Sequence, residues 1–142
     1  MTISDLLANL QDDQAVVVDG KTFDPNSIDE VELQTGEMVY WIREGDTWLS
    51  IDEEAEEVIL FQDIEEDIEM DSDALIYRGE DFELSIEVAG MLVDDGQQLD
   101  TVKYRDFENA DGEVFRIIQE GMSSDLYFAF GRKLAEEQLQ EL

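Results

Sequence analysis

The sequence predicts a mainly β protein in which two tandem, pseudo-repeated antiparallel meanders pack as one barrel-like or sandwich-like unit, with a short helix at each terminus. Two observations support this prediction. Apolar runs of strand length alternate with turns rich in Gly and Asp. The segment MVYWIREGDTWLSID (38–52) also recurs, in altered form, as TVKYRDFENADGEVFRIIQE (101–120). One such unit is too small to bury both faces of its sheet, so the two halves should share a core.

We therefore expect residues 1–142 to form a single structural unit. Residues 1–71 would hold the first β repeat and an N-terminal helix, and residues 72–142 the second β repeat and a C-terminal helix. The composition is 43% hydrophobic, and Trp, Tyr and Phe occur in patterned segments. The chain can therefore bury a core despite its high charge.

The N-terminal helix is predicted from the spacing of Leu6, Leu7 and Leu10, which places three apolar side chains near one helical face. Thr2 or Ser4 would supply its N-cap. In the rest of the first half, the predicted strands are 15–18, 22–23, 38–42, 47–51 and 58–61. Asp19-Gly20 is the turn that joins strands 15–18 and 22–23 into a hairpin, and Glu44-Gly45-Asp46 joins strands 38–42 and 47–51.

Alternation is clearest in the second half, where Phe82, Leu84, Ile86 and Val88 should share one face of a strand. Ala89-Gly90 is expected to end that strand. The predicted strands of this half are 74–77, 82–88, 91–93, 102–105, 114–118 and 126–130, followed by a short helix at 134–142.

The charge limits the partners that this chain can bind. The 39 acidic and 8 basic residues give a formal net charge of −31. Nucleic acid is excluded as a direct ligand, because its binding requires clustered Lys and Arg. Anionic membrane surfaces would also repel the protein. We expect a protein partner with a basic surface, whereas polyamines or divalent cations would bind only weakly.

The densest acidic run spans residues 52–71, which hold eleven acids and no base. Such a run is most often a solvated face or loop, and a high-salt host is another explanation for the surplus. If a partner recognises charge, this run is where we expect it. The candidate partner-binding residues are Glu53, Glu54, Glu56, Glu57, Glu65, Glu66 and Asp67, with Trp41 as an aromatic contact. Trp41 is the less secure member, because residues 40–42 are apolar on both strand faces and so favour burial.

An enzymatic role is not predicted. The chain has no Cys and no His, so disulfides, thiolate metal sites and the commonest general base are absent. Asp106 and Glu108 would share a strand face and could form a carboxylate pair, although a role as cross-strand partners is the preferred interpretation. We expect no catalytic residues, no cofactor and no structured metal site. No signal peptide or membrane span is predicted, so we expect a cytoplasmic protein.

Several motifs, in order, resemble a known family. They are Tyr77, Gly79 and Phe82; Trp48 to Asp52; Tyr104, Asp106, Phe107, Glu108 and Gly112; and the closing segment Phe128 to Leu134. Together they resemble the bacterial domain-of-unknown-function family 4178, over about residues 19–134. This chain departs from the family pattern in its acidity and in having Phe107 where Tyr is frequent.

The resemblance implies an accessory role. The family has no established activity, and its members are encoded near membrane-stress proteins of the phage-shock type and near polyamine-synthase-like proteins. We therefore expect a non-enzymatic adaptor or protein-binding module linked to membrane stress or remodelling. Two alternatives remain open: an acidic decoy that mimics nucleic acid and occupies a basic protein, and an ancillary component related to polyamines.

Overall fold

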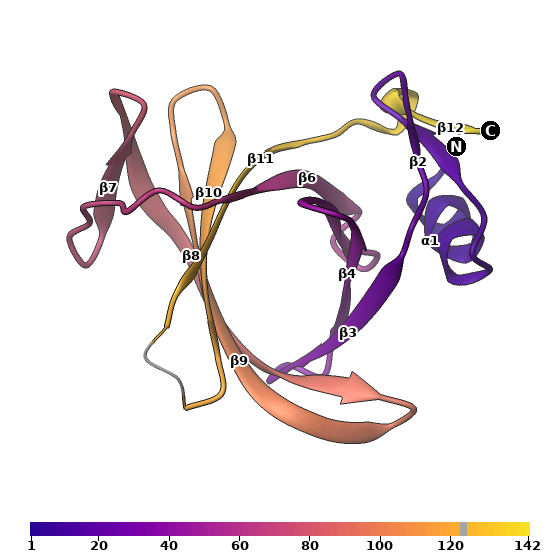
Figure 1. The fold of residues 1–142 in the computed structure, drawn as a ribbon, viewed down its shortest axis with the longest axis horizontal. Coiled ribbons are helices and arrows are strands. Elements are labelled where there is room, and N and C mark those ends of the chain that lie inside the picture. The colour runs from indigo at the N-terminus through magenta and orange to yellow at the C-terminus, as the bar shows by residue number, and fades with distance from the viewer. Residues whose placement is uncertain (123–124) are drawn as a thin grey trace.

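Eight antiparallel strands close into a barrel in the computed structural model, which describes residues 1–122 and 125–142 (Figure 1). One meander consists of β3 (Ser27–Leu33), β4 (Met38–Glu44), β5 (Thr47–Asp52) and β6 (Glu57–Ile64). The other consists of β8 (Glu80–Asp94), β9 (Gln97–Glu108), β10 (Glu113–Glu120) and β11 (Tyr127–Lys133). Pairing of β6 with β11 and of β3 with β8 joins the two meanders edge to edge. The predicted β class and the barrel-like unit are thus confirmed.

The seam between β3 and β8 closes the barrel, and it corrects two predictions. The expected strand end at Ala89-Gly90 is wrong, because β8 continues to Asp94 and pairs with β3 there. A Cβ atom on Gly90 would lie 2.7 Å from the backbone oxygen of Glu32, so this glycine permits a close approach rather than a turn. The strand β3 itself was not predicted.

The internal repeat remains a prediction. Trp41 and Tyr104, which the two copies of the motif align, both belong to the cluster inside the barrel, and their ring centroids lie 5.6 Å apart. Trp48 also lies in that cluster, whereas its aligned residue Phe115 packs in a different one. The pair Trp41 and Tyr104 therefore agrees with the alignment of the two motif copies, because both side chains point into the barrel. The pair Trp48 and Phe115 does not agree, because its side chains lie in different clusters.

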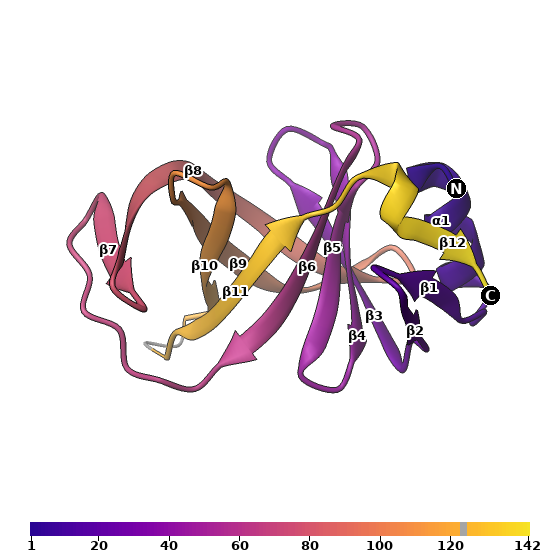
Figure 2. The same ribbon diagram turned by 90° about the horizontal axis from the view of Figure 1, so that it is seen from above.

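A second sheet covers one end of the molecule together with α1 (Ile3–Gln11) (Figure 2). Its strand order is β12 (Leu139–Glu141), β1 (Val16–Val18) and β2 (Lys21–Phe23). Thr2 caps α1, because its hydroxyl oxygen accepts a hydrogen bond from the backbone N–H of Asp5 at 3.1 Å. The buried leucines of α1 pack with Ile42 and Leu49 from the barrel. The N-terminal helix is thus observed as predicted.

The predicted C-terminal helix at 134–142 is wrong. This segment forms a single 3-10 turn, Glu136–Gln138, followed by β12. Leu139 is buried beside β1, and its carbonyl oxygen accepts a hydrogen bond from the amino terminus of Met1 at 3.0 Å. Pairing with β1 therefore overrides the helical propensity of the glutamates.

The barrel carries a further apolar cluster on the outside of β9, β10 and β11. The strand β7 (Ala74–Tyr77) pairs with the start of β8, at the end of the molecule away from α1 (Figure 2). Leu75, Tyr77 and Phe82 pack there against Phe107 and Phe115. The structure thus buries apolar groups both inside the barrel and on two parts of its outer surface.

None of the helices in the described part of the chain has the length and apolar character needed to cross a membrane.

Candidate functional site

The interior of the barrel holds a buried ion pair. Arg116 on β10 donates from Nε to Oδ1 of Asp106 at 2.7 Å and from Nη2 to Oδ2 at 2.9 Å. Its remaining Nη1 donates to the hydroxyl of Ser50 on β5 at 2.9 Å. Arg116 is only 2% exposed and Asp106 only 3%. The two charges therefore compensate each other away from water.

Aromatic rings enclose this guanidinium. Its central carbon lies 4.3 Å from the ring centroid of Tyr104 and 4.7 Å from that of Phe61, with Trp41 and Trp48 just beyond. Burial raises the pKa of Tyr104 to about 12, so its hydroxyl stays protonated at neutral pH. The interior of the barrel thus contains the ion pair and the aromatic side chains that surround it.

Asp106 and Glu108, the two carboxylates expected on one face of a strand, bind different partners. Both oxygens of Asp106 accept hydrogen bonds from Arg116. Glu108 accepts from the hydroxyl of Ser85 at 2.5 Å and from Nζ of Lys133 at 3.0 Å. Of the two interpretations of these residues, the geometry agrees with the one in which they are cross-strand partners.

The predicted partner-binding acids fall into two groups. Glu53, Glu54, Glu56 and Glu57, which we call the turn acids, lie at the turn between β5 and β6. Glu65, Glu66 and Asp67, which we call the linker acids, follow the other end of β6. The eight residues of β6 span about 25 Å at the usual rise per strand residue. The structure therefore does not bring these two groups together.

Trp41 is not available to a partner. It is only 3% exposed and lies inside the barrel, so its assignment as a surface contact is wrong. The alternative prediction, that the apolar run at 40–42 belongs to a core strand, agrees with the structure: Ile42 packs in the outer cluster beneath α1, while Trp41 packs inside.

Exposed apolar side chains lie beside the linker acids. Pairing of Ile64 with Phe128 places the end of β6 next to the start of β11. Tyr127 is 56% exposed and Leu126 is 39% exposed. These two residues and the linker acids line one shallow pocket of about 320 Å³. Sequence reasoning missed this surface, because it assigned 126–130 to a strand without showing which of its side chains would face solvent.

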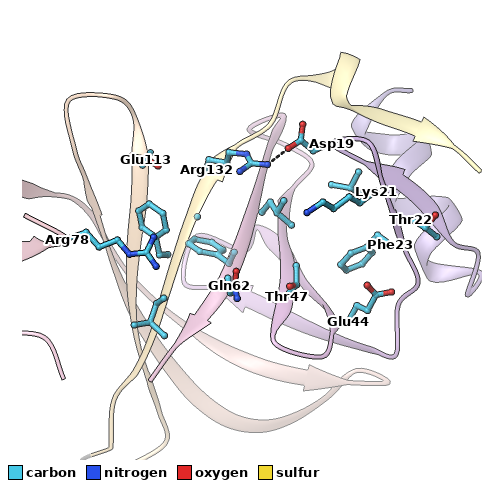
Figure 3. Close-up of a pocket in the computed structure, with 16 residues that line it drawn as sticks. Asp19, Lys21, Thr22, Phe23, Glu44, Thr47, Gln62, Arg78, Glu113 and Arg132 are labelled. Atoms are coloured by element: carbon cyan, nitrogen blue, oxygen red, sulfur yellow. Dashed lines mark hydrogen bonds and ion pairs between the residues drawn. The ribbon is translucent and has the colours of Figure 1, made fainter. Parts of the chain in front are cut away.

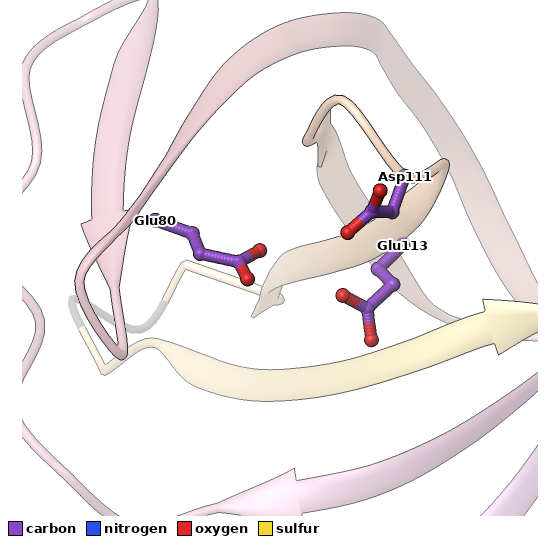
Figure 4. A group of neighbouring side chains, drawn as sticks. All are labelled: Glu80, Asp111 and Glu113. Atoms are coloured by element: carbon purple, nitrogen blue, oxygen red, sulfur yellow. The ribbon is translucent and has the colours of Figure 1, made fainter.

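Three carboxylates gather at another place, formed by the turn before β8 and the turn before β10 (Figure 4). Oxygens of Glu80, Asp111 and Glu113 lie within 4.8 Å of one another, which is a donor set that Ca²⁺ or Mg²⁺ could use. The amide of Asn109, however, donates to Glu80 at 2.5 Å and to Glu113 at 3.0 Å. This amide already offsets part of the mutual repulsion between the carboxylates, which a bound metal ion would otherwise neutralise.

A groove of about 420 Å³ lies between the small sheet and the outer face of the barrel (Figure 3). Leu60 and Phe130 are among its apolar lining residues. Lys21, Arg78 and Arg132 also line it, and Arg132 forms an ion pair with Asp19. Basic residues that are far apart in the sequence thus line one groove.

Comparison of the chain with protein-family models, with curated proteins and with solved structures found no significant match. The resemblance to family 4178 therefore rests on the motifs of the sequence.

Proposed function

We propose that the protein is a non-enzymatic binding module that docks a partner protein through the linker acids together with Leu126 and Tyr127. The observation that carries this proposal is the position of two exposed apolar side chains directly beside three carboxylates in one shallow pocket. Tyrosine is enriched at protein interfaces because it supplies a large contact area at low entropic cost.

The chemistry of this surface defines the partner. The carboxylates would attract a basic protein and orient it, chiefly by speeding association. An apolar side chain of the partner would then bury Tyr127 and Leu126, and this contact would slow dissociation. The partner we propose therefore carries Lys or Arg around a protruding apolar residue.

The motifs of the sequence supply the cellular context of the proposal. Their resemblance to family 4178 supports an accessory role in a bacterial membrane-stress or membrane-remodelling system, carried out in the cytoplasm. We further propose that the two meanders, β3 to β6 and β8 to β11, derive from one duplicated unit. The matching order of strands in the two halves supports this.

The test compares one variant that removes an aromatic ring with two variants that each remove three negative charges. Immobilised protein captures its partner from the source-cell lysate, and the amount of that partner is measured on three variants. They are Tyr127→Ser, the linker variant (Glu65→Gln, Glu66→Gln, Asp67→Asn) and the turn variant (Glu53→Gln, Glu54→Gln, Glu56→Gln). We expect the first two to lose the partner and the turn variant, which removes the same charge elsewhere, to retain it.

Two results would overturn the proposal. Equal loss on the linker and turn variants, with release as salt rises above about 0.15 M, would indicate binding by net charge alone, as in a nucleic-acid mimic. Full retention of the partner by Tyr127→Ser would show that the side chain of Tyr127 is not part of the interface. Calorimetry with spermidine tests the polyamine alternative. Binding heats that fit a defined number of spermidine molecules per protein would support it, and heats without a defined stoichiometry would rule it out.

A further inference from the structure

A second depression adjoins the proposed docking surface. It has a volume of about 500 Å³, and Glu87, Lys103, Arg105 and Ile117 are among its lining residues, so we call it the β9 pocket after its central strand. Leu126 lines both the β9 pocket and the pocket that holds the linker acids. A partner that covers Leu126 is therefore placed to contact both.

Strand pairing fixes the surroundings of Lys103. Lys103 and Arg105 lie two residues apart on β9, and Tyr104 between them packs inside the barrel, so both basic side chains face outward. The residues opposite Lys103 are Ala89 on β8 and Gln119 on β10. The cross-strand neighbours of this exposed lysine thus carry no charge.

The neighbouring charges of the β9 pocket lie elsewhere. Nη1 of Arg105 donates to the backbone oxygen of Ser72 at 3.0 Å, and the guanidinium lies over the ring of Phe107, 5.4 Å from its centroid. Glu87 is opposite Arg105 rather than Lys103. Within residues 1–122 and 125–142, none of the ion pairs involves Lys103. Lys103 is therefore the cation that this pocket offers to a partner.

The charge changes sign across Leu126. On one side, the pocket with the linker acids is lined by four acidic residues and one basic residue, Arg43, which is already paired with Asp63. On the other side, the described lining of the β9 pocket has two basic residues and one acidic residue. A partner that is basic throughout would bring a like charge to Lys103, which weakens binding.

We propose that the partner segment docked on Leu126 and Tyr127 is bipolar, with Lys or Arg toward the linker acids and Asp or Glu toward Lys103. This inference rests on the proposed function, because it specifies the partner of the same surface. Since β10 lies between β9 and β11, two strand spacings of about 4.8 Å separate Lys103 from the start of β11. An extended chain covers that distance in about three residues, which sets the spacing between the apolar residue and the acid.

Two peptides test the charge pattern, Ac-KKSFSSE-NH₂ and Ac-KKSFSSQ-NH₂. Each is titrated into ¹⁵N-labelled full-length protein and followed by amide chemical shifts. The general attraction of a protein with a net charge of −31 favours the glutamine peptide, which is the more cationic of the two. We expect the opposite order, in which the glutamate peptide binds about threefold more tightly and shifts the amides of Lys103, Leu126 and Tyr127.

Variants assign the preference to one side chain. Lys103→Gln should abolish or reverse it, whereas Lys103→Arg should retain it. The matched control is Lys21→Gln, which removes the same charge from the groove beside the small sheet and should leave the preference unchanged. The same spectra report whether each variant is folded.

The outcomes separate this inference from the proposed function. If both peptides shift Leu126 and Tyr127 but the glutamine peptide binds as tightly as the glutamate peptide or more so, the bipolar partner is overturned and the docking surface stands. A preference for glutamate that persists in Lys103→Gln overturns the role of Lys103. If neither peptide gives saturable shifts at Leu126 and Tyr127, the result counts against the docking surface and this inference together.

Discussion

Arg116 and Asp106 are directly opposite each other on β10 and β9, and their side chains form a bidentate ion pair inside the closed barrel. The pair lies among aromatic rings that cannot replace water as hydrogen-bond partners. Burial by itself would lower the pKa of Arg116, but the Asp106 carboxylate raises the pKa above its ordinary value. Each charge therefore depends on the other to remain buried.

Removing one partner of this pair should be far more damaging than removing both. Asp106→Asn leaves a buried guanidinium without a counter-charge, and we expect the free energy of unfolding to fall by about 3–5 kcal/mol in urea titrations. The double variant Asp106→Leu, Arg116→Met should recover most of that loss. Glu108→Gln, at a partly exposed pair, should cost about 1 kcal/mol or less at neutral pH. A loss below about 1 kcal/mol for Asp106→Asn would contradict the structural role of the pair.

The strand periodicity of the sequence predicts the hairpins well but not the closure of the barrel. Hairpins such as β4–β5 carry a local signal, because Gly45 and its neighbours specify a tight turn between two apolar runs. The strand β3 carries Asp29, Glu30 and Glu32 in place of apolar residues, so its composition resembles a loop. Its strand state depends on pairing with both β4 and β8, and this information is not local in the sequence.

The candidate sites, like the strands, are only partly encoded in local sequence. The acidic run is visible in the sequence, but its separation into turn acids and linker acids depends on the length of β6, which lies between them. Tyr127 comes next to the linker acids only through the pairing of β6 with β11. Lys21 and Arg78 line one groove although they lie in different halves of the chain. Tertiary contacts between distant segments, rather than composition, therefore create both the docking surface and the groove.

The two tryptophans should emit as buried residues. Trp41 and Trp48 lie inside the barrel with ring centroids 5.5 Å apart. We expect a blue-shifted emission maximum in the native protein, weak quenching by acrylamide, and a red shift on unfolding in urea. Emission at the wavelength of solvated tryptophan under native conditions would show that the interior of the barrel is open to water.

The ion pair of Glu108 should make a pH-dependent contribution to stability. Hydrogen bonds from Ser85 and from Lys133 lower the pKa of Glu108 below its ordinary value of 4.5. A carboxyl group with a lowered folded-state pKa stabilises the protein above its unfolded pKa, and that contribution is lost as the pH falls through the folded value. Glu108→Gln should therefore reduce the unfolding free energy at pH 7 and have little effect near pH 3. Glu53→Gln in the exposed turn is the control, and an equal effect of Glu108→Gln at both pH values would contradict the assignment.

Salt should stabilise the fold through its net charge. With 39 acids and 8 bases, repulsion between carboxylates opposes the compact state at low ionic strength. Raising the salt concentration shortens the Debye length to about 8 Å at 0.15 M and about 3 Å at 1 M, so this repulsion is screened. We expect the melting temperature to rise with NaCl over that interval, by less in a variant that lacks both the turn acids and the linker acids. A melting temperature that does not change with salt would show that the acids are too dispersed to destabilise the barrel.

Closure of the barrel should depend on the absence of a side chain at Gly90. A Cβ atom there would lie 2.7 Å from the backbone oxygen of Glu32, which belongs to β3 and cannot swing away as a side chain can. Gly90→Ala must therefore push β3 from β8, and we expect a loss of about 1–3 kcal/mol in unfolding free energy. Faster hydrogen exchange at the amides of β3 would locate the damage at the seam.

Ala89→Ser, at the preceding residue of β8, is the matched control and should change stability by about 0.5 kcal/mol or less. Gly131→Ala tests the other junction between the meanders, because its added Cβ would meet the backbone oxygen of Leu60 on β6. If Gly90→Ala retained parental stability and slow exchange in β3, the pairing of β3 with β8 would not hold the barrel closed. Loss of protection in β3 alone would instead show that the seam opens as a unit while β4 to β6 and β9 to β11 remain folded.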